Sequence, residues 1–276
     1  MRRMAPALVL GAAALVAVTG CGAQSAAPLG NVKLVAAEAV QESAQKAEEV
    51  TSYSADVVFD VAGGREETGK VQGRVVYQGK PELATDITLD TLSFGARNVP
   101  GGVRAILVGE TVYVKSELLT QLAGATKPWV KVSVGDLDSG GQGEVRELMA
   151  QAQQFDLADT VKLLTASDDV KAVGTETVGG VDTTHYSGTF PVAEAVQALD
   201  PAERERVEKQ FASAKDVKFD LWADGQSLPR KVTLSGSEQG TTFSMAVHFQ
   251  DFNEPVSIVA PPADQVGDLP ERQGGN

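Results

Sequence analysis

The sequence predicts an α+β fold in which a strongly curved antiparallel sheet, a half-barrel of about ten or eleven strands, carries helices on its concave face. Two observations lead to this fold class. Most segments between residues 53 and 260 alternate apolar with polar residues, so each strand has one face in water and one dry face. Only about four or five modest helical patterns are available to cover the dry faces, and a bent sheet wrapped around them satisfies this need.

The first helix is predicted over residues 33–50, where Ala36, Val40, Ala44 and Ala47 recur at steps of three and four. Further helical patterns cover residues 144–154, 157–167, 192–199 and 200–214. The apolar stripe of the first helix is mostly alanine. Either the alanines let this helix sit tightly on the sheet, or they leave a gap large enough for an apolar guest.

The strand patterns alternate with a period of two, and glycine turns separate them. They cover residues 53–61, 70–78, 81–95, 102–115, 127–134, 170–190, 217–224, 229–236, 241–252 and 256–260. The pairs Gly109-Glu110 and Gly179-Gly180 divide two of these segments into hairpins. Alternation places one set of apolar side chains on the concave face, as candidates for lining an apolar cavity: Val57, Phe59, Val75, Tyr77, Ile87, Leu89, Val112, Val114, Phe219, Leu221, Phe243, Met245 and Val247.

The only cysteine, Cys21, follows an export signal. Arg2 and Arg3 precede an uncharged apolar run over residues 7–18, which has the length of a signal peptide and is too short to span a bilayer. The run ends in Val-Thr-Gly-Cys, which resembles a bacterial lipobox and implies cleavage between Gly20 and Cys21 and acylation of the thiol. The alternative is an ordinary secretory peptide that leaves a free thiol.

The predicted organisation is therefore a lipoprotein signal peptide (1–20), a lipidated cysteine and tether (21–32), a single folded domain (33–262) and a flexible acidic tail (263–276). The net charge of −13 disfavours nucleic acid and anionic headgroups as partners. We therefore expect the acyl chains to anchor the protein to the extracytoplasmic side of the cell membrane, without help from a basic patch.

Catalytic signatures are missing from the sequence, and we expect no enzyme activity, no cofactor and no metal. The two histidines, His185 and His248, fall within strand patterns, and no nucleophile elbow or phosphate loop occurs. Residues 136–147 match an EF-hand loop in part, but Gly140 and Gly143 stand where an oxygen ligand and an aliphatic residue are expected. We interpret this segment as a glycine loop before an acidic helix start.

Two segments could gate a cavity, namely residues 116–128, which contain three leucines, and residues 192–214. The simpler interpretation of the first is a connector that faces the core, and that of the second is a solvated helix face. We adopt the simpler interpretation for both.

The order of five segments resembles the LppX/LprG group of actinobacterial lipoproteins, which are related in fold to LolA, LolB and RseB. The segments are VTSYSADV, VRAILVGETVYVK, VGTETVGGVDTTHYSGTF, FDLWADGQSLPRKVTLSG and FQDFNEPVSIVAPP, and the similarity covers most of residues 33–262. The resemblance implies a half-barrel around a hydrophobic cavity that carries acyl lipids or lipoglycans. It transfers no binding residue, because the family has no short ligand motif.

The function predicted from these observations is that of a membrane-anchored lipoprotein that binds an acyl lipid or lipoglycan and carries or chaperones it at the cell envelope, with a membrane transporter or signalling protein as a further partner. The alternative is a non-enzymatic sensor or regulatory lipoprotein that contacts a membrane signalling protein. The alternative predicts an exposed apolar patch in place of an enclosed pocket. An envelope hydrolase is the third and least favoured hypothesis.

Overall fold

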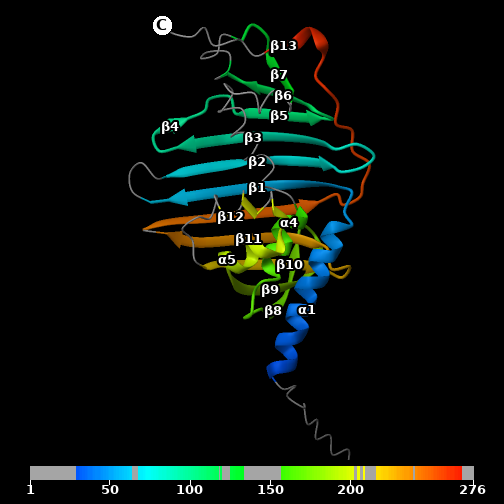
Figure 1. Cartoon of the computed structure of the whole chain (residues 1–276), viewed down its shortest axis with the longest axis vertical. Coiled ribbons are helices and arrows are strands. Elements are labelled where there is room, and N and C mark those ends of the chain that lie inside the picture. The colour runs from blue at the N-terminus through cyan, green and yellow to red at the C-terminus, as the bar shows by residue number, and fades with distance from the viewer. Residues whose placement is uncertain are drawn as a thin grey trace, which may run out of the picture.

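Thirteen strands form one continuous sheet that curves without closing on itself in the computed structural model (Figure 1). The residues that the structure describes are 29–63, 68–117, 119, 125–133, 157–201, 204, 205, 208, 216–238 and 240–268, with side chains from residue 35 onward. The strand count exceeds the expected ten or eleven because very short strands add to the sheet.

The strands follow one another with short turns for most of the chain. The first seven are β1 (Ser52–Ala62), β2 (Gly69–Gln78), β3 (Ala84–Phe94), β4 (Arg97–Asn98), β5 (Val103–Val108), β6 (Thr111–Ser116) and β7 (Trp129–Ser133). The others are β8 (Lys171–Val178), β9 (Val181–Pro191), β10 (Asp216–Asp224), β11 (Pro229–Glu238), β12 (Thr241–Gln250) and β13 (Val266–Asp268).

Strand β1 lies at the middle of the sheet, between β2, which follows it in the chain, and β12, from the C-terminal part of the chain. The spatial order is β13-β7-β6-β5-β3-β2-β1-β12-β11-β10-β9-β8, with β4 paired to β3 alone. All pairs are antiparallel except β13 with β7. Pairing of β1 with β12 brings Val57 opposite Val247 and Phe59 opposite Met245, residues that are far apart in the sequence.

The pairing of β2 with β3 is bent by a bulge between Gln72 and Gly73. A Cβ atom at residue 73 would lie 2.1 Å from the backbone oxygen of Thr88, so only glycine allows this approach of the two strands. Register shifts also occur within β8 and between β10 and β11. Bulges increase local twist, which accounts for part of the curvature of the sheet.

Four short or medium helices lie against the lower half of the sheet in Figure 1, in front of β8–β12. They are α1 (Leu29–Glu48), α4 (Leu157–Leu164), α5 (Val192–Ala195) and the 3-10 turn η3 (Val196–Ala198). Helix α1 begins four residues before the position expected from its alanine stripe. The patterns predicted over residues 144–154 and most of 200–214 lie outside the described residues.

The segment that follows β12 runs along the strand ends to the edge of the sheet that β7 and β13 form (Figure 1). The prediction of a strand over residues 256–260 is wrong, because this stretch has no regular structure. It stands between Pro255 and the pair Pro261-Pro262, whose backbones have no N–H to donate to a ladder. Residues 263–268, expected to begin a flexible tail, form the 3-10 turn η4 (Ala263–Gln265) and β13, which pairs with β7.

Candidate functional site

All the residues predicted to line a cavity lie on one face of the sheet, the face against which the helices pack. Directly opposed residues of an antiparallel pair point to the same side, so the register assigns the faces. One row of opposed residues runs from Leu221 through Val232, Val247 and Val57 to Gly73 and Leu89. We call this side of the sheet the inner face and the other side the outer face.

Two clusters of buried apolar side chains occupy the inner face. The helix-side cluster combines the buried residues of α1, α4, α5 and η3 with those of β1–β3 and β9–β12, and it contains the candidates Val57, Val75, Ile87, Phe219, Leu221 and Val247. The second cluster lies on β3 and β5–β7 and contains Val112 and Val114. These eight candidates are buried, so they form core and offer no open lining.

Between the clusters lies a set of half-buried apolar side chains, which we call the central band: Phe59, Val61, Val71, Phe243 and Met245. They come from the three adjacent strands β1, β2 and β12, and the register opposes Phe59 to both Val71 and Met245. Phe94 continues the band on β3, opposite Gly69, and is 52% exposed. The band is therefore an apolar surface that the described side chains cover only in part.

The described helices lie to one side of the central band. Their main contacts are with one another and with β8 and β9. The buried stripe of α1, which is Ala36, Val40, Ala44 and Ala47, belongs to the helix-side cluster together with Val161 and Leu164 of α4. Of the two possibilities left by the alanine stripe, tight seating therefore holds for α1 where it meets α4 and β8. No described helix makes its main contacts with β1, β2 or β12.

An aromatic group fills the end of the inner face at which β1 begins. The rings of Tyr53 and Tyr77 stack at 5.0 Å, and Phe249 meets Tyr53 edge-on at 5.7 Å. Phe252 extends the group, and the guanidinium of Arg230 lies 4.9 Å above its ring. Because Tyr53 and Phe249 are buried, this end of the inner face is packed with rings, and the central band lies nearer the opposite strand ends.

The hydroxyl of Ser43 is fully buried on α1 and has no hydrogen-bond partner among the described residues. A buried hydroxyl without a partner destabilises the folded state by about 1–3 kcal/mol. We therefore expect Ser43→Ala to raise the free energy of unfolding by about 1 kcal/mol in urea titrations. A loss of stability would mean that the hydroxyl has a partner that the described residues do not include. Ala44→Ser, on the same face, is the reverse control and should be destabilising.

Both histidines lie on the outer face, away from the central band. His185 stacks on Trp222 with ring centroids 4.3 Å apart, and its Nε2 lies 2.9 Å from Oδ1 of Asp220. The Lys231 ammonium lies over the Trp222 ring, 4.3 Å from its centroid, and the indole N–H donates to Glu176 at 2.5 Å. His248 lies exposed on β12, opposite Lys231. These contacts join β8, β9, β10 and β11.

Asp220 is held in its charged form by this group. Burial alone would raise the pKa of Asp220, but hydrogen bonds from His185 and Ser187 and the charges of His185 and Lys218 outweigh burial and lower the pKa below its ordinary value of 3.8. A carboxylate with a lowered pKa stabilises the fold above its unfolded pKa, and this contribution disappears as the pH falls through the folded pKa.

Replacement of Asp220 by asparagine tests this contribution. We expect Asp220→Asn to lower the free energy of unfolding at pH 7 by about 1.5–3 kcal/mol, the range for hydrogen bonds to a charged group. The difference from wild type should shrink as the pH is lowered below about 4, where the wild-type carboxylate becomes protonated. Urea titrations at a series of pH values measure it, with the exposed Asp90→Asn as control. A difference that is constant down to pH 2 would contradict the assignment.

The described residues contain no group of three or more histidine, cysteine or acidic side chains placed to hold a metal ion. The partial EF-hand at residues 136–147 and the lipobox at Cys21 lie outside the described residues, as does part of each predicted gating segment. None of the described helices combines the length and the apolar character that a membrane-spanning helix needs.

Sequence reasoning missed several residues of the site. Val61 and Val71 share the inner face with the predicted candidates, and alternation alone places them there. Phe94 is also absent from the predicted candidates, although its exposed ring continues the central band. The aromatic group around Tyr53 could not be found without the register that brings β12 beside β1.

The family comparison matches residues 157–258 with the model of the LppX_LprAFG lipoprotein family. This segment starts at α4 and includes β8–β12. An uncharacterized 31.2 kDa protein of Streptomyces griseus is 32% identical over 176 residues, which are 59% of this chain and 58% of that protein. A protein of Streptomyces coelicolor is 26% identical over 197 residues, 71% of this chain and 59% of the relative. The chain thus spans less than two thirds of either relative.

Two solved structures are similar to this chain. LprF from Mycobacterium bovis has a TM-score of 0.50 at 15% sequence identity, with 83% of this chain and 97% of that chain covered. LppX from Mycobacterium tuberculosis has a TM-score of 0.44 at 18% identity, with 82% and 99% covered. The likeness to LprF confirms the predicted fold, a curved antiparallel half-barrel with helices on one face.

Proposed function

We propose, on the premise that this chain belongs to the LppX_LprAFG lipoprotein family through residues 157–258, that it binds the acyl chains of a lipid along the central band and carries or chaperones that lipid at the cell envelope. The observation that supports the proposal is the half-buried state of Phe59, Val71, Phe243 and Met245 between two buried clusters. The proposed activity is binding, without a chemical step.

The physical basis is that the central band is an apolar surface with incomplete cover. An acyl chain laid across it would remove both its own methylenes and the facing side chains from water. Each buried methylene contributes about 0.8 kcal/mol, so burial of about ten methylenes contributes roughly 8 kcal/mol before the ordering of the chain is subtracted. The band lies on rigid strands, which lowers the ordering cost on the protein side.

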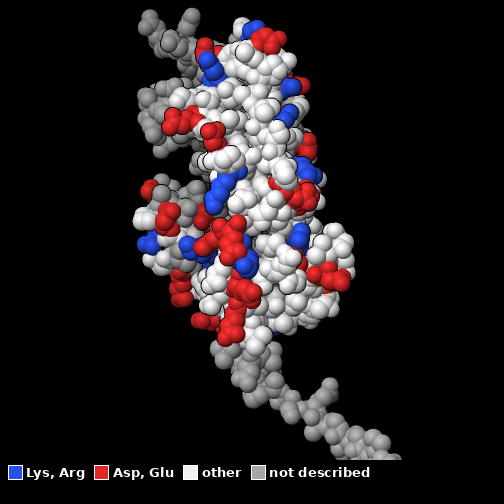
Figure 2. All heavy atoms as spheres, turned by 90° about the vertical axis from the view of Figure 1, so that its right-hand side faces the viewer, with Lys and Arg blue, Asp and Glu red and all other residues white. Residues whose placement is uncertain are grey.

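A lipid anchor would hold the protein at the membrane, where a lipid ligand is found. We propose that acylation of Cys21 holds the protein at the membrane, because two or more acyl chains give stable attachment. Figure 2 shows acidic and basic side chains interspersed on one side of the molecule, with acidic ones gathered over the part where α1 lies. With a net charge of −13, a general attraction to anionic headgroups does not replace the anchor.

Replacement of Cys21 by alanine tests the anchor. We expect cells grown with labelled palmitate to incorporate the label into the wild-type protein and none into Cys21→Ala, because the thiol is the only acceptor of its kind in the chain. Gel electrophoresis after delipidation reports covalent label. Equal labelling of both proteins would contradict the lipobox assignment. It would not affect the proposal that the central band binds a lipid, which is tested separately.

The binding proposal is tested with the chain from residue 22 onward, exported through a cleavable secretory signal, so that any recovered lipid is a ligand and not the anchor. Organic extraction of the purified protein followed by mass spectrometry is expected to yield acyl lipid in a constant ratio to protein. Protein that is repeatedly free of lipid, from cells that make the native envelope lipids, would contradict carriage. That result would favour a surface that contacts a membrane signalling protein instead.

A further inference from the structure

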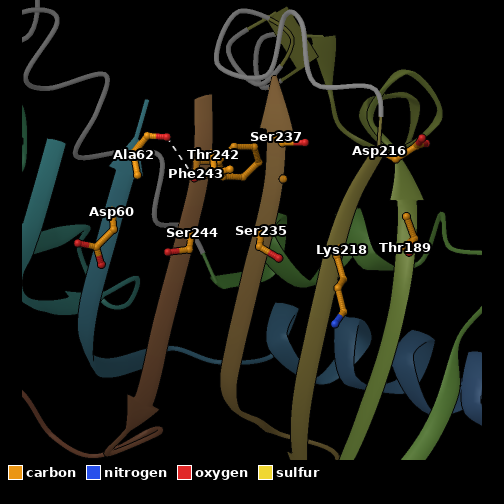
Figure 3. Close-up of a pocket in the computed structure, with 11 residues that line it drawn as sticks. Asp60, Ala62, Thr189, Asp216, Lys218, Ser235, Ser237, Thr242, Phe243 and Ser244 are labelled. Carbon is orange, nitrogen blue, oxygen red and sulfur yellow. Dashed lines mark hydrogen bonds between the residues drawn. The ribbon is translucent and has the colours of Figure 1, made fainter. Parts of the chain in front are cut away.

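The outer face contains an open hollow of about 470 Å³ that shares only Phe243 with the central band (Figure 3). It lies over the adjacent strands β1, β12, β11, β10 and β9, near the ends at which β1 stops and β10 begins. In Figure 3 its side chains stand in front of the sheet while α1 lies behind it. Five hydroxyl side chains, two carboxylates and one ammonium surround it: Thr189, Ser235, Ser237, Thr242, Ser244, Asp60, Asp216 and Lys218.

The hollow follows from a run of short side chains across the strands. The register aligns Asp60, Ser244, Ser235, Lys218 and Thr189 in one row of the outer face. The next row towards the strand ends holds Ala62, Thr242 and Ser237. Serine, threonine and alanine in the middle of both rows leave a depression between the longer acidic and basic side chains at its sides.

Gly236 forms part of the floor of the hollow, where no side chain separates the backbone from the Phe243 ring. A Cβ atom at this position would come within 2.6 Å of the Phe243 ring, so glycine is required for the ring to lie across the strand. Phe243 therefore borders the hollow as well as the central band. The hollow has an apolar element in its floor and polar groups around it.

Several polar groups of the hollow are available to a ligand. Among the described residues, the hydroxyls of Ser235, Ser237 and Ser244 make no side-chain hydrogen bond, and Asp216 and Lys218 form no ion pair. The hydroxyl of Thr242 donates to the backbone oxygen of Ala62 at 3.1 Å and keeps its lone pairs free. Asp60 lies 3.6 Å from the ammonium of Lys70, outside the hollow. Each free hydroxyl can both donate and accept.

The arrangement of charges excludes several ligand classes. Asp60 and Asp216 stand on strands three positions apart, and a strand spacing of about 4.8 Å puts them roughly 14 Å from each other, too far to share one cation. An anion such as phosphate would meet two carboxylates and only one ammonium. An apolar guest would leave the hydroxyls unpaired, at about 1–3 kcal/mol for each buried group.

We propose that this hollow is a binding site for a neutral saccharide unit. Sugar hydroxyls donate and accept as the serine hydroxyls do, and they can donate to the carboxylates and accept from Lys218. A volume of 470 Å³ lies within the range of roughly 300–1,000 Å³ for small-molecule sites. The site lies on the opposite face from the central band and shares only Phe243 with it, so the proposal does not rest on the proposed lipid binding.

The test is nuclear magnetic resonance of the full chain labelled with ¹⁵N-serine, solubilised in a detergent without a sugar headgroup. Maltose and N,N′-diacetylchitobiose are titrated separately, and sodium phosphate is the comparison probe. Saturable shifts are expected for the amides of Ser235, Ser237 and Ser244 with at least one disaccharide. Serines elsewhere in the same sample, such as Ser93 and Ser133, serve as internal controls and should not move.

A blocking variant supplies the second measurement. Ser235→Trp fills the middle of the hollow and is expected to weaken binding at least about tenfold, the equivalent of one or two lost hydrogen bonds. The matched control is Ser133→Trp. Ser133 is also on the outer face, but on β7 near the opposite edge of the sheet, so this variant should bind the disaccharide as wild type does. Absence of shifts with both disaccharides, equal binding by Ser235→Trp, or shifts with phosphate alone would each overturn the proposal.

Discussion

Replacing Phe219 with alanine is expected to lower the free energy of unfolding by about 3–5 kcal/mol, the range for removal of a buried phenylalanine ring. Phe219 is fully buried on β10, and its ring lies over Gly188 of β9, where a Cβ atom would come within 2.8 Å of it. Its ring centroid is 6.2 Å from that of Phe190. A ring held between strands and helices leaves a cavity that its neighbours cannot fill when it is removed.

Urea titration followed by circular dichroism measures this effect, and Phe94→Ala is the matched control. Phe94 is also on the inner face but is 52% exposed, so its removal should lower the free energy of unfolding by about 1 kcal/mol. Similar losses for the two variants would mean that Phe219 is not central to the core. A denaturant midpoint shift with an unchanged slope would show that the variant still unfolds in one transition.

The strands and their inner faces could be predicted from the sequence because the signal is local. Alternation along β1 or β12 shows which residues share a face, whichever strand lies alongside. All the predicted cavity residues therefore lie on the inner face. The same alternation could not separate core from open surface: Leu221 and Met245 have the same pattern, but one is fully buried and the other is half-buried.

What could not be predicted depends on contacts between distant segments. Strand β13 contains one apolar residue, Val266, and exists because it pairs with β7 beside Trp129. No local pattern announces such a pairing, whereas the apolar run at residues 256–260 imitates a strand and is irregular. The position of α1 beside β8 likewise depends on tertiary contacts, and it places the described helices to one side of the central band.

Phe59→Asp is expected to abolish the binding of acyl chains. Phe59 is at the centre of the band, opposite Val71 on β2 and Met245 on β12. A carboxylate at this position would have to lose water whenever an acyl chain covers it, and the desolvation of an unpaired charge costs several kcal/mol. Because each 1.4 kcal/mol changes an equilibrium constant tenfold, we expect affinity to fall by at least about a hundredfold.

The adjacent residue Val58 offers the matched control. Val58 is also half-buried on β1, but it is opposed to Ala246 on the outer face, so Val58→Asp adds the same charge on the other side of the sheet. Thermal unfolding of both variants separates loss of binding from loss of fold. If Phe59→Asp does not fold, Val71→Asp on β2 places the charge in the same band.

The most direct measurement is a fluorescence titration with cis-parinaric acid, a fatty acid that emits strongly only in apolar surroundings, after organic extraction of the native ligand and refolding. Wild-type protein and Val58→Asp are predicted to give the same saturable emission, and Phe59→Asp to give none above background. Equal emission from Phe59→Asp, or no emission from folded wild-type protein, would contradict the account that the central band binds acyl chains.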